Sequence, residues 1–111
     1  MVKNMKIKIS ESEILNAVCE YLTLKHYTFW RSNNVPIYDP RKKIFRRMPK
    51  YSMKGVSDII LLLDGTAWLI EVKTEKGVLS EHQKIFKALV EKRKCIYLVV
   101  KSVDDLIVAG F

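Results

Sequence analysis

Asp58, Glu71 and Lys73 are three charged residues in parts of the sequence that are otherwise almost entirely apolar. Carboxylate oxygens are the ligands that hard divalent cations such as Mg²⁺ prefer, commonly one or two carboxylates completed by phosphate oxygens and water. A bound cation would turn the repulsion between two neighbouring carboxylates into attraction. The three residues therefore indicate a metal site, and the alternative is a buried ion-pair cluster with a structural role.

A β-hairpin would bring these three residues together. Residues 56–63 and 66–74 are predicted to be strands, and the Asp-Gly pair between them is a two-residue turn signal of type I′. A symmetric turn sets Asp58 opposite Glu71, and side chains in such a pair lie about 4.5–5.5 Å apart at Cβ. Lys73 points to the same face, because side chains alternate along a strand. The same register pairs Leu63 with Thr66, Leu61 with Trp68 and Ile59 with Ile70.

A third acid stands at the start of the first predicted helix, residues 11–25. Ser10 is a good N-cap, and Glu13 completes an S-x-x-E capping box with it, so Glu13 points to solvent. Glu11 projects instead from the core-facing stripe of the helix. A favourable interaction with the helix dipole explains an acid at this position, and a third carboxylate of the metal site is the other explanation. The core-facing stripe consists of Ile14, Leu15, Val18, Cys19 and Leu22.

The remaining segments predict an α/β fold in which helices flank a mixed sheet. They are a strand at 27–33, a loop or loose hairpin at about 34–54, a helix at 81–93, a strand at 94–100 and a short helix at 103–109. Ser80 and Gln83 form a second capping box, which is one explanation for Gln83. The strands at 56–63 and 94–100 are expected to be central, because apolar residues on both faces must be covered. The order α-β-loop-β-β-α-β-α contains no linker, so we expect one domain over residues 1–111.

The composition points to a nucleic-acid partner. The 111 residues include 20 Lys and Arg against 12 Asp and Glu, which gives a net charge of +8. Such an excess in a small protein suggests a polyanionic partner. Trp30 and Tyr51 could stack on an unpaired base, and burial in the core is the alternative for Trp30. The basic residues concentrate in the loop at about 34–54, with Arg41, Lys42, Lys43, Arg46, Arg47, Lys50 and Lys54.

Other classes of protein are excluded by simple patterns. The longest apolar stretch, residues 59–63, is far too short for a membrane-spanning helix, and the first nine residues lack the apolar block of a signal peptide. Cys19 and Cys95 are too isolated for a zinc site or a disulfide framework, so we expect reduced thiols. A globular protein that acts on nucleic acid remains.

Three motifs resemble those of the PD-(D/E)xK nuclease superfamily and, more narrowly, those of the VRR-NUC (virus-type replication-repair nuclease) family. They are Gly55-Val56-Ser57-Asp58, Glu71-Val72-Lys73, and Gln83 on the helix that follows. The resemblance covers nearly the whole chain and extends to Glu11, to Trp30-Arg31-Ser32-Asn33 and to residues 79–83. Ser57 stands where the superfamily has Pro, at a position expected to shape the backbone before the acid and to supply no ligand.

The resemblance implies a restriction-endonuclease-like fold and an endonuclease that depends on Mg²⁺ or Mn²⁺, with no small-molecule cofactor and no membrane partner. Asp58 and Glu71 would hold the cation together with the carbonyl group of Val72. Glu11 would bind the same cation directly or through water. The cation would lower the pKa of a water molecule and polarise the phosphate.

The resemblance also implies roles for residues beyond the cation ligands. Lys73 would position the attacking water, and Gln83 would orient Lys73 or that water. Arg31 and the basic loop would contact DNA phosphates, which provide affinity without sequence selectivity. Small members of the family are expected to be cytoplasmic homodimers, in a bacterium or a phage-infected host, that cut branched DNA such as four-way junctions or flaps. A non-catalytic nucleic-acid-binding module and a nuclease for linear duplex DNA are the alternatives.

Overall fold

The computed structural model describes residues 8–32, 38–45 and 50–111 of the chain. In these residues four strands form one sheet in the order β1-β4-β5-β6, and the two short strands β2 and β3 pair separately. The elements are α1 (Glu11–Leu24), β1 (Thr28–Arg31), β2 (Tyr38–Asp39), β3 (Ile44–Phe45), β4 (Ile59–Leu63), β5 (Thr66–Val72), α2 (Glu81–Lys92), β6 (Ile96–Val100) and α3 (Val103–Val108).

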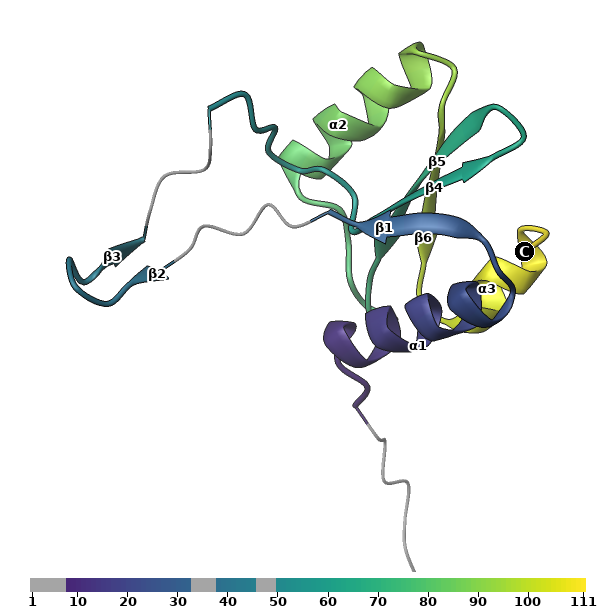
Figure 1. The fold of residues 1–111 in the computed structure, drawn as a ribbon, viewed down its shortest axis with the longest axis horizontal. Helices are drawn as coiled ribbons and strands as arrows, with labels where there is room; N and C mark the ends of the chain where they lie inside the picture. The colour runs from purple at the N-terminus through teal and green to yellow at the C-terminus, as the bar shows by residue number, and fades with distance from the viewer. Residues whose placement is uncertain (1–7, 33–37, 46–49) are drawn as a thin grey trace, which may run out of the picture.

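The four-stranded sheet is mixed and has helices on both faces. The β1–β4 and β4–β5 pairs are antiparallel, whereas β5 and β6 are parallel. Parallel neighbours need a crossover connection, and α2 supplies it. In Figure 1, α1 and α3 lie together on one face of the sheet and α2 lies on the other, while β2 and β3 lie apart from the sheet. The predicted α/β fold class is confirmed.

Helix α1 begins where the sequence predicts. The Ser10 side chain accepts a hydrogen bond from the backbone N–H of Glu13 at 3.2 Å, which satisfies one of the free donors of the first turn. The predicted capping box is only half formed, because the Glu13 carboxylate accepts from the Ser10 hydroxyl at 3.1 Å. The helix ends at Leu24, one residue before the predicted end.

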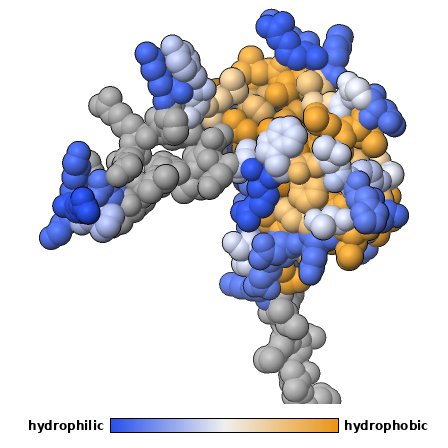
Figure 2. Space-filling view, in the orientation of Figure 1, coloured by the Kyte–Doolittle hydropathy of each residue, from blue (hydrophilic) through white to orange (hydrophobic). Residues whose placement is uncertain are grey.

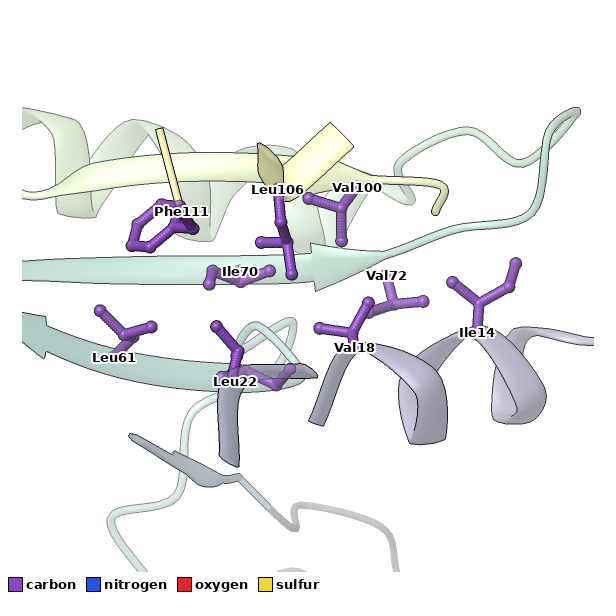
Figure 3. Close-up of a cluster of buried hydrophobic side chains, with 10 residues drawn as sticks. Ile14, Val18, Leu22, Leu61, Ile70, Val72, Val100, Leu106 and Phe111 are labelled. Carbon is purple, nitrogen blue, oxygen red and sulfur yellow. The ribbon is translucent and has the colours of Figure 1, made fainter. Parts of the chain in front are cut away.

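The main hydrophobic core lies between the sheet and the α1/α3 layer. Ile14, Val18 and Leu22 recur at four-residue spacing, so all three point from α1 towards the sheet (Figure 3). Full burial of a Val, Leu or Ile side chain contributes about 1.5–3 kcal/mol, so this stripe fixes α1 against the sheet. From the sheet and the α3 segment the core includes Ile59, Leu61, Ile70, Val72, Val100, Leu106 and Phe111.

The β4–β5 hairpin has the predicted register. Ile59 pairs with Ile70 and Leu63 pairs with Thr66, with Leu61 opposite Trp68 between them. The turn residues Asp64 and Gly65 have φ values of 48° and 77°, the positive values that a type I′ turn requires at both positions. The turn chemistry therefore determines which residues of the two strands face each other.

Both strands of the hairpin are shorter than predicted. Strand β4 begins at Ile59 and not at residue 56, and β5 ends at Val72 and not at residue 74. The reason lies at Asp58, where the chain bends and a carboxylate oxygen accepts from the Val72 N–H at 2.8 Å. In a longer strand the Val72 N–H would donate to a backbone carbonyl group of the neighbouring strand. Here the Asp58 carboxylate takes the place of that carbonyl group.

Two expectations about coverage of the sheet are wrong. Among the described residues β6 pairs only with β5, so it is an edge strand of the sheet. The second face of the sheet is also incompletely covered, because α2 packs against β6 and leaves Leu62 of β4 47% exposed. Ile85 and Leu89 of α2 are likewise exposed. Figure 2 shows an apolar area over the part of the molecule that contains α2.

Two findings concern the membrane-span and cysteine patterns. In residues 8–32, 38–45 and 50–111, no helix is both long and apolar enough to cross a membrane. Cys19 and Cys95 are free thiols, as expected. Burial raises the pKa of Cys19, which favours the protonated thiol.

Candidate metal centre

Three carboxylates meet at the end of the β4–β5 hairpin opposite its turn. Glu11, Asp58 and Glu71 each present an oxygen, and these atoms all lie within 4.8 Å of one another. They come from the first turn of α1, the bend before β4 and the penultimate residue of β5. Negative charges this close repel one another, so the cluster needs either a proton or a cation to be stable.

Asp58 is held by backbone bonds on both sides. Its Oδ2 accepts from the Val72 N–H at 2.8 Å, and its backbone carbonyl accepts from the Ser32 N–H at 3.0 Å. The Ser32 hydroxyl also donates to the carbonyl group of Ser57. Ser57 is fully buried, and its own hydroxyl donates to the carbonyl group of Ile59 at 3.1 Å. These bonds shape the backbone before the acid, in agreement with the position expected for Ser57.

Gly55 places the segment that carries Asp58 directly against α2. Its φ is 77°, a left-handed conformation that side chains disfavour. A Cβ atom at this position would lie 2.3 Å from the carbonyl oxygen of His82 and 2.8 Å from the backbone nitrogen of Gln83. Only glycine permits this approach, so the segment before Asp58 and the first turn of α2 are positioned together.

Glu71 is the most buried acid of the centre, with 1% of its surface exposed. Its Oε1 accepts from Gln83 Nε2 at 2.9 Å, and the Lys73 ammonium lies 3.9 Å from the same oxygen. The backbone N–H of Lys73 donates to the carbonyl group of Val100 at 3.0 Å, so the β5–β6 pairing positions the lysine. The other oxygen, Glu71 Oε2, is buried and has no partner among the described residues.

The electrostatics of the centre favour a proton on Glu71 when no cation is bound. Burial raises the pKa of Glu71 to about 8, and the charge of the neighbouring Asp58 carboxylate acts in the same direction. Lys73 lowers this pKa, whereas Glu11 raises it further. A cation would supply the positive charge that the proton provides, so it would compete with the proton for the same carboxylates.

Gln83 caps α2, as its sequence position suggested, and also contacts one of the three acids. Its side-chain oxygen accepts from the Ser80 N–H at 2.9 Å while its own backbone N–H donates to the Ser80 hydroxyl at 3.2 Å, which is a complete capping box. Its Nε2 donates to Glu71. The start of α2 therefore orients one end of this amide towards the helix and the other towards the buried acid.

The donor set fits a hard divalent cation. Three carboxylates from separate elements converge, and Glu71 offers a buried oxygen that no described residue satisfies. Glu11 is exposed, so the centre is open to solvent on the side of α1. Val72, expected to contribute its carbonyl group, lies between Glu71 and Lys73 and uses its N–H to bind Asp58.

The basic residues fall into separate groups. Arg31 is exposed at the end of β1, and Lys54 is exposed next to Gly55. Arg41, Lys42 and Lys43 are exposed between β2 and β3, and Asp39 Oδ1 accepts from the backbone N–H groups of Arg41 and Lys42. Lys50 lies 5.3 Å from the ring centroid of Tyr51. Arg46 and Arg47 lie outside the described residues.

The two aromatic residues considered for base stacking are on the surface. Tyr51 is 93% exposed, and Trp30 is 47% exposed, so burial of Trp30 in the core is not observed. Trp30 pairs with Ile60 and shares the sheet face on which α2 lies.

Sequence reasoning did not give a contact role to Ser32, Gly55 or Tyr97. Gly55 had a detectable signal, because glycine at the start of an apolar segment often marks a close backbone approach. Ser32 belonged to a quoted motif but offered no indication that it binds the backbone around Asp58. Tyr97 gave no signal, since its place on the same sheet face as Glu71 follows from the parallel β5–β6 register.

The mixed sheet with helices on both faces, and the Asp58 and Glu71-x-Lys73 centre at its end, define the class as a restriction-endonuclease-like α/β protein. Residues 9–104 match the family model described as the VRR-NUC domain. The chain therefore belongs to the VRR-NUC family, as the motifs predicted, and carries a nuclease-type domain with DNA as its substrate class. Comparison with curated proteins and with solved structures gave no match.

Proposed function

We propose that this protein is an endonuclease that depends on Mg²⁺ or Mn²⁺ and cuts phosphodiester bonds in branched DNA, with residues 1–111 acting as one domain. The observations that carry the metal dependence are the convergence of Glu11, Asp58 and Glu71, whose carboxylate oxygens lie within 4.8 Å of one another, and a buried oxygen of Glu71 that no described residue satisfies. A purely structural ion-pair cluster is less favourable here. Among the described residues, only Lys73 forms an ion pair with one of these acids, at a separation of 3.9 Å from Glu71 Oε1.

Asp58, Glu71 and Glu11 would hold the cation, with the carbonyl group of Val72 as a further ligand. A bound divalent cation supplies positive charge that lowers the pKa of a water molecule and polarises a phosphoryl oxygen. The Lys73 ammonium would orient the attacking water and stabilise the charge that develops on the phosphate. Attack in line with the 3′ oxygen would leave a 5′-phosphate and a 3′-hydroxyl.

Gln83 would act through Glu71 in this scheme. Its Nε2 fixes Glu71 Oε1 at 2.9 Å, so the carboxylate keeps one orientation when the cation binds. Arg31, Lys54, Lys50 and the basic residues between β2 and β3 would contact the DNA backbone. Phosphate contacts provide affinity and position but carry no sequence information, so we expect little sequence preference.

We further propose that the protein acts as a homodimer. The support is the incompletely covered sheet face, where Trp30 and Leu62 lie 47% exposed and α2 exposes Ile85 and Leu89. An exposed apolar area of this kind is typical of an interaction surface. Light scattering tests the oligomeric state, and we expect Leu62→Lys to convert dimers into monomers. A wild-type monomer at micromolar concentration would contradict the proposal.

A cleavage panel tests the proposed activity. Forks, flaps, four-way junctions and plain duplexes are incubated with the protein, with Mg²⁺, with Mn²⁺ or with a chelator. We expect cation-dependent cutting of the branched substrates, and loss of cutting by a factor of at least about 100 for Glu71→Gln and Lys73→Ala with binding retained. Equal cutting of linear duplex would refute the branch selectivity. Binding without any cutting would support a non-catalytic module.

A further inference from the structure

Tyr97 carries a buried hydroxyl group on the sheet face that contains the metal centre. In the parallel β5–β6 pairing Tyr97 is the partner of Leu69, and Val99 is the partner of Glu71. Side chains two residues apart share a face, so Tyr97 and Glu71 point to the same side of the sheet. The Tyr97 oxygen is fully buried and, like Glu71 Oε2, has no hydrogen-bond partner in the described part of the chain.

Helix α2 covers both residues. Gln83 in its first turn donates to Glu71, and Phe86, three residues later on the same side of the helix, packs its ring edge-on to Tyr97 at a centroid distance of 6.2 Å. The contact with the buried Phe86 ring fixes the direction of the Tyr97 ring. The hydroxyl is therefore held beneath the same helix that orients Glu71.

A buried hydroxyl without a partner destabilises the folded state, and phenylalanine would fill the same space without that loss. Buried tyrosines accordingly place their hydroxyl against a polar group. Burial raises the pKa of Tyr97 most, and the charges of Glu71 and Asp58 raise it further. The phenol therefore lies within the electrostatic reach of both acids. We therefore expect the hydrogen-bond partner of the Tyr97 hydroxyl to belong to the metal centre.

We propose that Tyr97 is a positioning residue for Glu71: its hydroxyl, through one bound water, is the polar partner of the second oxygen of Glu71. A carboxylate oxygen has two lone pairs, so Oε2 can bind a cation with one and accept from this water with the other. A water shared by two buried polar groups is a stable part of a protein interior. Gln83 on Oε1 and Tyr97 on Oε2 would then hold the carboxylate from both ends.

The experiment compares Tyr97→Phe with Tyr21→Phe in the full chain. Tyr21 donates to the backbone oxygen of Phe111 at 2.7 Å, remote from the centre, so its loss removes a purely structural hydrogen bond. Mn²⁺ affinity is measured by calorimetry without DNA, and thermal unfolding is measured in chelator. Loss of a group that orients a metal ligand typically lowers metal affinity or activity by about 10- to 100-fold. We expect Tyr97→Phe to bind Mn²⁺ about tenfold more weakly and to unfold no earlier than wild type.

We expect the opposite result for Tyr21→Phe, namely unchanged Mn²⁺ affinity and a lower unfolding temperature. Equal Mn²⁺ affinity in Tyr97→Phe and wild type, or a parallel loss of stability and affinity, would overturn the role of Tyr97. The inference about Tyr97 rests on the proposed metal-dependent function. The experiment distinguishes failure of the proposed function from failure of the role of Tyr97. If wild type itself takes up no Mn²⁺, the proposed function and the role of Tyr97 are both wrong. If only the variant comparison fails, the metal site stands.

Discussion

Gln83 and Glu71 are joined by a hydrogen bond of 2.9 Å from Nε2 to Oε1, and the same Gln83 side chain caps α2 by accepting from the Ser80 N–H. One amide thus belongs to a helix terminus and to the metal centre. Because the cap fixes the oxygen end, the nitrogen end can point only towards the carboxylate. Gln83 therefore makes two contributions that can be tested separately, one to the stability of α2 and one to the orientation of Glu71.

Substitutions at Gln83 and Ser80 separate these two properties. Gln83→Glu keeps an acceptor for the Ser80 N–H but directs a carboxylate at Glu71, so we expect cleavage to fall by about 10- to 100-fold. Ser80→Ala removes a capping side chain and should lower the unfolding free energy by about 1 kcal/mol while cleavage is retained. Denaturant unfolding and cleavage rates measure both. Equal cleavage in the two variants would contradict the assigned role of Gln83.

Alanine at Gly55 should disrupt the site, whereas alanine at Gly65 should not. Both glycines have a φ of 77°, so both substitutions introduce left-handed strain of about 1–2 kcal/mol. Only Gly55 would also force a Cβ atom to within 2.3 Å of the His82 carbonyl oxygen, since nothing lies within 4 Å of a Cβ at Gly65. We expect Gly55→Ala to unfold at a lower temperature than Gly65→Ala and to lose cleavage. Similar behaviour of both variants would show that the Gly55 contact is unimportant.

The raised pKa of Glu71 predicts a pH dependence of stability. Between its ordinary pKa of 4.5 and its folded value of about 8, Glu71 holds a proton in the folded state that it releases on unfolding. The unfolding free energy of the cation-free protein should therefore fall as the pH rises through this window, by about 1.4 kcal/mol for each unit of raised pKa at most. Thermal unfolding of wild type and Glu71→Gln from pH 5 to pH 8 tests this. A pH dependence unchanged by the substitution would refute it.

Removal of basic residues between β2 and β3 should weaken DNA binding in a salt-dependent way. Each phosphate contact contributes about 0.9 to the slope of log K against log salt. We expect Arg41→Ala with Lys42→Ala to reduce that slope by up to about 1.8, measured by fluorescence anisotropy. The control, Lys25→Ala with Lys92→Ala, removes equal charge from the helix ends opposite Glu11 and Gln83. A larger effect in the control would place the DNA elsewhere.

The hairpin could be predicted from sequence because its determinants are local. The Asp64-Gly65 turn determined the register from Ile59 to Leu63, and this register placed Asp58 near Glu71. The bend at Asp58 could not be predicted, because it depends on a hydrogen bond from Val72, which is 14 positions away in the chain. The alternation of side chains along a strand predicts that Asp58 continues the strand. It does not indicate that the Asp58 carboxylate replaces a backbone acceptor.

Features that depend on contacts between distant parts of the chain were harder to predict from the sequence. The edge position of β6 and the exposure of Ile85 depend on how far α2 extends across the sheet, which apolar spacing alone does not specify. Tyr97 lies on the same sheet face as Glu71 because the crossover through α2 sets β6 beside β5. Glu11 was placed by helical phase, since the position of α1 is determined by its buried stripe.

The central claim is that Glu11, Asp58 and Glu71 hold a divalent cation, and Mn²⁺ soaking of crystals tests it most directly. Anomalous scattering locates Mn²⁺ without reference to activity. The proposal predicts one strong peak within coordination distance, about 2.0–2.4 Å, of carboxylate oxygens of Asp58 and Glu71, and no such peak in Glu71→Gln. A wild-type crystal with no peak at this position in saturating Mn²⁺, or with its peak at other residues, would contradict the claim.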